Sequence, residues 1–194
     1  MNYLMHLYLS NNDEELMVGN FIADDVKGNK VYDYPPGISQ GIILHRAIDD
    51  FSDRHPAVRQ SAAMLRPLYG KYAGVAVDVF YDHFLAVNFN QYSSTGLDDF
   101  AGYCYRTMLK NWGNLPWSVK LFLPFVIKHK RLQSYAKFTG LTEALLIMSK
   151  YSRFPNKAKD AVKMLKVNYS DFGANFETFF PDVQAFSNAR IAQI

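Results

Sequence analysis

The chain has 194 residues, of which 49% are hydrophobic and 20% charged. This composition excludes a disordered protein, and we expect one domain over residues 1–194 with a real core. The net charge of +3 is too small to indicate nucleic-acid binding, so we expect no nucleic-acid partner. The single cysteine, Cys104, excludes an internal disulfide and a cysteine-rich zinc site.

The beginning of the sequence carries no targeting signal that we can identify. The segment MNYLMHLYLS is apolar but short, has no basic residue before it, and is not followed by a cleavage site of small residues. No apolar run reaches the roughly 18 residues that a spanning helix needs. We therefore expect a soluble, cytoplasmic protein without membrane association.

Helical spacing of apolar residues dominates the chain, and no hairpin or repeat pattern is present. The residues from Asn12 onward favour a helix that runs to about residue 23, and Pro35-Pro36 can begin the next one. On that helix we predict one buried face, made by Ile38, Ile42, Ile43, Ala47, Ile48 and Phe51.

The remaining helices follow in order. Pro56 opens a short helix, and residues 70–89 read as one long helix with Val75, Val79, Phe80, Phe84 and Val87 buried. Later helices are predicted over 97–111, 117–128, 140–150, 156–166 and 169–189. Pro124 and Pro181 should kink or end the helices in which they lie. The predicted fold class is all-α, a single-domain helical bundle.

Charge is unevenly distributed along the chain. Residues 1–108 contain 13 acidic and 8 basic residues, whereas residues 109–194 contain 5 acidic and 13 basic residues. Four of the five histidines also lie in the first part. A cation site in the first part and a surface for an anionic partner in the second would produce this pattern, and solvated helix faces are the alternative.

Two predicted helices each carry possible metal ligands four residues apart. His45 and Asp49 share one helix face, and so do Asp78 and Asp82 on the long helix. Helix bundles build metal sites from pairs of this kind on facing helices. An isolated pair is more often an ordinary surface hydrogen bond.

Two further candidates lie beside apolar residues, where a charge is costly unless a cation pairs with it. They are His6 and Asp24. Taken together, the candidates predict a divalent metal site whose ligands come from a pool of six residues: His6, Asp24, His45, Asp49, Asp78 and Asp82. Mixed imidazole and carboxylate ligands suit Mn, Fe, Mg or Zn.

Four segments within residues 1–85 resemble, in the same order, the motifs of the acyl carrier protein phosphodiesterase family. They are MNYLMHLYLS, GNFIADDVKG, GIILHRAIDDFSD and VAVDVFYDHFLA. Residues 148–153 and 176–181 match the family more loosely. The resemblance implies a Mn²⁺-dependent, all-α enzyme distantly related to the HD-domain phosphohydrolases. It also implies a reaction, hydrolysis of the phosphodiester that joins 4′-phosphopantetheine to a serine of acyl carrier protein.

Under this resemblance, three more residues receive catalytic roles. Arg46 can hold a phosphate oxygen with paired donors. His83 can protonate the leaving serine oxygen or orient a metal ligand. Asn20 can hold water or substrate, and Asp53 is expected to support a ligand or cap a helix.

Acyl carrier proteins are strongly acidic, so the basic second part is the predicted docking surface. Its candidate residues are Lys128, Lys130, Arg131, Lys157, Lys159, Lys163 and Lys166. An ordinary solvated helix face is the alternative for the last four.

Two other functions stay open at this stage. One is an HD-like phosphohydrolase acting on a nucleotide or another phosphoester. The chain lacks the adjacent His-Asp doublet of that superfamily, since Asp82-His83 has the reverse order. The other is a non-enzymatic helical module that binds an acidic partner or nucleic acid. Oligomeric state cannot be predicted from these residues.

Overall fold

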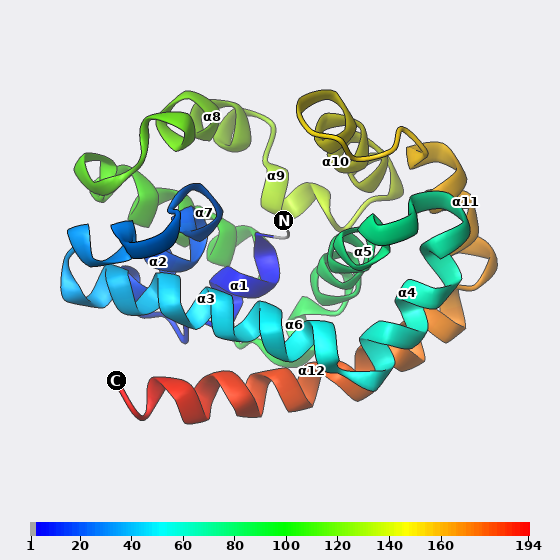
Figure 1. The fold of residues 1–194 in the computed structure, drawn as a ribbon, viewed down its shortest axis with the longest axis horizontal. Helices are drawn as coiled ribbons and strands as arrows, with labels where there is room; N and C mark the ends of the chain where they lie inside the picture. The colour runs from blue at the N-terminus through cyan, green and yellow to red at the C-terminus, as the bar shows by residue number, and fades with distance from the viewer. Residues whose placement is uncertain (1–2) are drawn as a thin grey trace.

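A computed structural model describes residues 3–194 and is helical throughout, without a strand in that part of the chain (Figure 1). The predicted all-α fold class is confirmed. Short 3-10 segments lie at Ala23–Asp25, Gly28–Asp33, Gly70–Tyr72 and Trp112–Asn114. The α-helices are α1 Leu4–Tyr8, α2 Glu14–Ile22, α3 Pro36–Arg54, α4 Pro56–Tyr69, α5 Ala73–Val87, α6 Phe89–Tyr92, α7 Leu97–Lys110, α8 Trp117–Lys128, α9 Arg131–Ser134, α10 Phe138–Tyr151, α11 Ala158–Val167 and α12 Tyr169–Ile191.

Local chemistry explains where several helices begin. The carboxylate of Asp13 accepts the Leu16 N–H at 2.9 Å and so caps α2. The helices α3 and α4 both begin with a proline, whose missing N–H costs nothing at that position. The predicted starts of these three helices therefore agree with the structure.

Pro124 and Pro181, predicted to kink or end their helices, lie inside α8 and α12, so neither proline ends its helix. In α12 the buried rings of Phe179 and Phe180 directly precede the proline, and their packing helps to hold the helix in place despite the lost hydrogen bond. Ile43 and Val87, predicted to be buried, are 39% and 42% exposed because each lies on the solvent side of its helix.

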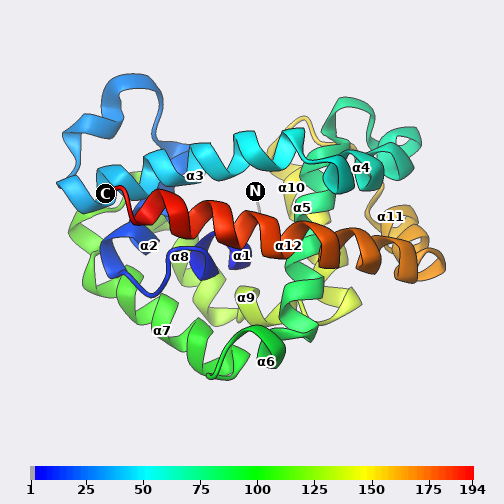
Figure 2. The same cartoon turned by 90° about the horizontal axis from the view of Figure 1, so that it is seen from below.

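The aromatic residues form the centre of the core around α5 and α12. Phe172, Phe176 and Phe180 of α12 are fully buried, and the ring of Phe172 meets that of Phe80 edge to face at 5.3 Å. The helices α12 and α3 run side by side along one face of the molecule (Figure 2). This packing fixes α3 and α5, the two helices that carry the paired ligand candidates.

The helices α2 and α3 cross with their backbones in close contact at Gly19 and Gly41. A Cβ placed on Gly19 would lie 2.7 Å from the Gly41 Cα and would collide with the Ile38 carbonyl oxygen. Only glycine allows this approach. The crossing holds Asn20, and Asp24 just beyond the end of α2, close to His45 of α3.

The short helix α1 is attached at its beginning to α5. Both carboxylate oxygens of the buried Asp82 accept backbone N–H groups of α1, from Leu4 at 3.0 Å and from Met5 at 2.9 Å. These are groups that the helix itself leaves unpaired. The attachment places His6, the next residue of α1, against α3.

None of the helices in residues 3–194 combines the length and the apolar character that crossing a membrane would require.

Candidate metal centre

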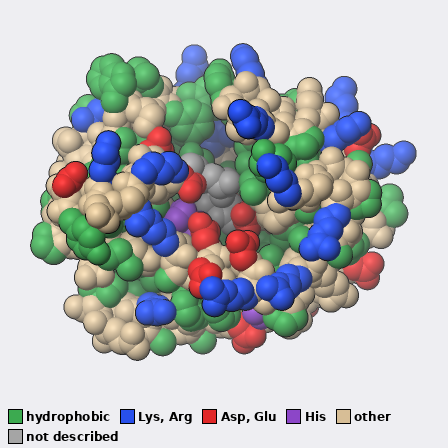
Figure 3. Space-filling model, viewed as in Figure 1, with side chains coloured by type: hydrophobic (Ala, Val, Ile, Leu, Met, Phe, Trp, Pro, Cys, Tyr) green, Lys and Arg blue, Asp and Glu red, His purple; other side chains and the backbone are tan. Residues whose placement is uncertain are grey.

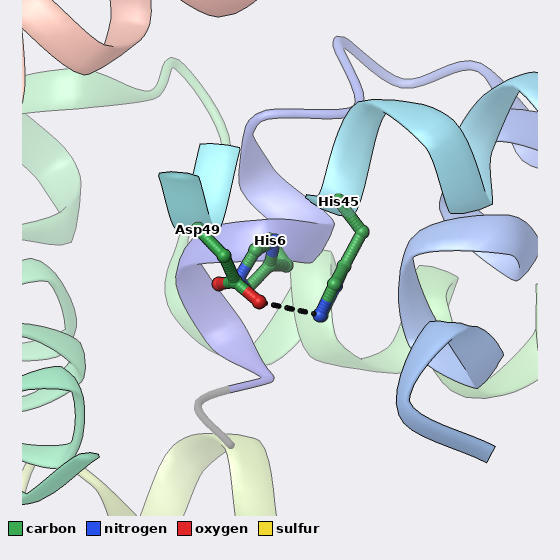
Figure 4. A group of neighbouring side chains, drawn as sticks. All are labelled: His6, His45 and Asp49. Atoms are coloured by element: carbon green, nitrogen blue, oxygen red, sulfur yellow. Dashed lines mark hydrogen bonds and ion pairs between the residues drawn. The ribbon is translucent and has the colours of Figure 1, made fainter. Parts of the chain in front are cut away.

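The side chains of His6, His45 and Asp49 point toward one another (Figure 4). One ligand atom from each residue lies within 4.8 Å of the others. The Asp49 carboxylate spans both rings, with Oδ1 3.1 Å from His6 Nε2 and Oδ2 3.2 Å from His45 Nε2. The two imidazole rings stack with centroids 3.9 Å apart. Part of the predicted ligand pool is therefore brought together from α1 and α3.

A closed hydrogen-bond network sets the protonation of His6. Asn20 donates its amide N–H to Ser10 Oγ at 2.8 Å, and Ser10 Oγ donates to the His6 carbonyl oxygen at 3.0 Å. The remaining amide oxygen of Asn20 therefore accepts the N–H of His6 Nδ1, at 3.2 Å. Burial, together with the charge on His45, lowers the pKa of His6 and favours the neutral ring.

The consequence appears at the other ring nitrogen. Because the Asn20 oxygen accepts from Nδ1, the other ring nitrogen, Nε2, is the one that faces Asp49 Oδ1, 3.1 Å away. A proton on Nε2 or a metal cation can bridge these two atoms. A ligand histidine in metalloproteins has this arrangement, with its second nitrogen donating to an orienting group.

The carboxylates beside His45 favour its protonated form. Burial alone would lower its pKa, but hydrogen bonding to the carboxylates of Asp24 and Asp49 outweighs burial and raises the pKa to about 9. The distance from its Nε2 to Asp24 Oδ1 is 3.7 Å. Its buried Nδ1 has no hydrogen-bond partner within residues 3–194. The same contacts lower the pKa values of Asp24 and Asp49 against the effect of burial.

A pocket of about 200 Å³ opens over the three residues. Asp78 of α5 lies in its wall, and burial, with the charges of Asp49 and Asp53 adding to it, raises the pKa of Asp78 to about 7. Figure 3 shows acidic side chains gathered near the centre of the face that is turned toward the viewer, with Lys and Arg around them. The full lining is His6, Asp24, His45, Asp49, Ser52, Asp53, Val75 and Asp78.

The structure does not bring Asp82 into this lining. Its two oxygens are occupied by the N–H groups of Leu4 and Met5, and burial raises its pKa to about 7 although these hydrogen bonds oppose the shift. Asp82 therefore positions α1, and through it His6. Sequence spacing placed Asp82 on the same helix face as Asp78 but could not show that a backbone segment covers it.

Arg46 and His83 also lie outside the pocket lining. Arg46 is exposed, and its Nη2 donates to the Val26 carbonyl oxygen at 2.8 Å. His83 is buried, and its Nδ1 donates to the Tyr135 carbonyl oxygen at 2.8 Å while its Nε2 accepts the Tyr169 hydroxyl at 3.1 Å. His83 thus connects α5 to Tyr135, which follows α9, and to Tyr169 at the start of α12. Asn20 orients His6 and does not line the pocket.

The predicted docking residues fall into two groups. The six lysines are exposed, with Lys128 and Lys130 at the end of α8 and Lys157, Lys159, Lys163 and Lys166 on or beside α11. Arg131 is a correction, because it is 4% exposed. Its guanidinium donates to Glu143 Oε2 at 2.9 Å and to the Gly140 carbonyl oxygen, so it holds α9 against α10 instead of facing a partner.

Sequence reasoning missed Ser10 and Ser52. Ser10 follows His6 by four residues and completes the network that orients the ring. Ser52 follows Asp49 by three residues on α3 and lines the pocket. Their helical spacing from the ligand candidates was the available signal.

The fold and this pocket define a helical protein with a candidate site for a divalent cation. A family model described as acyl carrier protein phosphodiesterase matches residues 1–183. The chain belongs to this family. A protein of Serratia proteamaculans with that name is 31% identical over 186 residues, covering 94% of this chain and 95% of its relative. Proteins of the same name from Yersinia pestis and Salmonella agona are 29% and 28% identical, over 93% and 95% of this chain and 94% and 96% of theirs. No solved structure matches the chain, so the relationship to HD-domain proteins stays a prediction.

Proposed function

We propose that this protein hydrolyses the phosphodiester between 4′-phosphopantetheine and a serine of holo acyl carrier protein. The products are the apo carrier protein and 4′-phosphopantetheine. Family membership supports the substrate. The observation that carries the chemistry is the convergence of His6, His45 and Asp49, whose ligand atoms lie within 4.8 Å of one another, close enough for one cation to contact all three.

The residues present fit a divalent ion such as Mn²⁺. His6 and His45 supply imidazole nitrogens, Asp49 bridges them, and Asp24 and Asp78 supply further oxygens from the same pocket. A bound divalent ion lowers the pKa of water and neutralises charge that develops on a phosphate. Its binding must displace the proton of His45, so we expect affinity to rise with pH below about 9.

The protein's own groups orient the ligands. Asn20 fixes the tautomer of His6 through Nδ1, and Asp82 fixes the start of α1. Arg46 lies on α3 next to His45 and can offer further N–H donors to a phosphate oxygen. Because both ring nitrogens of His83 are engaged away from the pocket, we assign it a positioning role and not proton transfer.

Mass spectrometry of holo carrier protein, incubated with the purified protein and Mn²⁺, tests the proposal. Hydrolysis at the serine–phosphate bond should remove about 340 Da, the mass of the phosphopantetheine group. Asp49→Ala should abolish this loss while the circular dichroism spectrum stays helical. Asp50→Ala is the matched control, because Asp50 is the next residue on α3 but pairs with Arg54 at 2.6 Å. An unchanged carrier mass, or full turnover by Asp49→Ala, would contradict the proposal.

Docking of the acidic carrier protein is proposed for the exposed lysines. Electrostatic steering weakens as salt screens charge, so kcat/KM should fall as ionic strength rises. Replacing Lys159, Lys163 and Lys166 by Ala should lower kcat/KM at low salt and flatten this dependence. A flat profile for the unaltered protein would reject steering.

A further inference from the structure

A second pocket, mostly hydrophobic and of about 300 Å³, lies between α8 and α10. Phe122 and Val126 of α8 form one side, and Ala144, Ile147 and Met148 of α10 form the other. A volume near 300 Å³ is at the lower end of the range for small-molecule sites. The cavity admits a narrow chain but not the surface of a folded protein.

Tyr3 connects this pocket to the candidate metal centre. Tyr3 lines the apolar pocket, and its ring packs against Phe21 of α2 with centroids 4.8 Å apart. Phe21 precedes Asp24 by three residues, and Asp24 lines the metal pocket. Burial and the nearby charges of Asp24 and Asp25 raise the pKa of Tyr3, so its hydroxyl lies in their field. Tyr3 therefore lies between the apolar pocket and α2, the helix that ends just before Asp24 of the metal pocket.

The apolar pocket also includes a motif that the metal centre does not use. Residues 148–153 resemble the family in sequence, and Met148, Tyr151 and Ser152 from this segment line the cavity. Tyr151 is 76% exposed and stands at the rim. The segment 148–153 therefore forms part of the wall of the apolar pocket.

A phosphodiester has two substituents, and the two differ in this substrate. One is the serine of a folded acidic protein, and the other is the pantetheine arm, a narrow and uncharged chain that begins with a gem-dimethyl group. An apolar cavity favours the methyl and methylene groups of an uncharged chain and leaves its amides to find partners at the rim, whereas it strongly disfavours acidic protein surface.

Building on the proposed function, we infer that the pocket between α8 and α10 binds the pantetheine arm of the substrate while the phosphate lies at the metal centre. Tyr3 and Phe122 would contact the part of the arm nearest the phosphate. Tyr151, at the rim, can offer its hydroxyl group to an amide of the arm. The arm, and not only the carrier protein, then contributes to recognition.

Calorimetry with small ligands tests this assignment without turnover. The ligands are pantetheine, 4′-phosphopantetheine and inorganic phosphate, each with the Mn²⁺-loaded protein. Ala144→Phe fills the pocket and should weaken binding of pantetheine and 4′-phosphopantetheine about tenfold, with little change for phosphate. Leu146→Phe is the matched control on α10, because Leu146 is exposed and absent from the pocket lining. Equal pantetheine affinity in both variants would overturn the inference.

Two further measurements separate the possible failures. If Ala144→Phe loses its helical circular dichroism, Met148→Ala trims the same wall and should still weaken pantetheine binding several-fold. Turnover of holo carrier protein by the unaltered protein judges the proposed function separately. Turnover that persists with an unchanged KM in a folded Ala144→Phe would reject the arm site and leave the activity standing. Pantetheine binding that is lost in Ala144→Phe supports the arm site whether or not turnover occurs.

Discussion

Replacement of Asp82 by Ala separates an anchoring role from a ligand role. The side chain is fully buried, and its oxygens accept the N–H groups of Leu4 and Met5 at 3.0 and 2.9 Å. Alanine leaves both donors buried without an acceptor. Each such donor costs about 1–3 kcal/mol, so the free energy of unfolding should fall by about 2–6 kcal/mol. Asp82→Asn keeps one carbonyl acceptor and should lose about half as much.

Urea denaturation followed by circular dichroism measures this loss. The experiment is done on both sides of pH 7, because burial raises the pKa of Asp82 to about 7 and so penalises its ionised form, and the loss is expected to be larger below that pH than above it. With Mn²⁺ excluded, any change reports the anchor alone. A free energy of unfolding within about 0.5 kcal/mol of the unaltered protein would refute the anchoring role. Normal stability with lost Mn²⁺ binding in Asp82→Asn would instead identify Asp82 as a ligand.

Three other outcomes test the same geometry. Asn20→Ala removes the acceptor that fixes the His6 tautomer. The affinity for Mn²⁺ should then fall about 10–100-fold in isothermal titration while the fold persists. An unchanged affinity would show that the hydrogen-bond network is unnecessary for binding. Gly19→Ala forces a Cβ against the α3 backbone and should cost about 1–3 kcal/mol in thermal or urea unfolding, whereas a neutral result would contradict the tight crossing. The folded-state pKa of His45, about 9, is above its ordinary value of 6.5, so its contribution to stability is complete below pH 6.5 and lost as pH rises through 9. In chelator-treated protein the stability difference between the unaltered chain and His45→Gln should therefore shrink over that interval, and a constant difference would count against the ion pairs.

The main helices could be predicted because their signals are local. Prolines at the starts of α3 and α4, the capping Asp13 and the apolar spacing along α5 each act within a few residues. The short helix α1 was missed because its stability depends on packing and on the distant Asp82. Sequence alone could not decide between a kink and a helix end at Pro181, because the aromatic packing beside it is a tertiary effect.

The sequence could predict which candidate ligands share a helix face, but not what lies opposite that face. Spacing identified His45 with Asp49 and Asp78 with Asp82 as pairs, yet only the first pair meets His6. What lies opposite a face is decided by other elements, such as the N–H groups of Leu4 and Met5 that occupy Asp82. For the same reason the burial of Arg131 beneath Glu143 could not be read from its charge.

The long separation between α1 and its anchor has a consequence during biosynthesis. His6 leaves the ribosome early, but the carboxylate that secures its helix is encoded 77 and 78 residues after the backbone groups it holds. Pairings so distant along a polypeptide close late in folding. In a nascent chain the imidazoles and acids therefore lie on separate segments, and the proposed metal centre forms only once the architecture around it is complete.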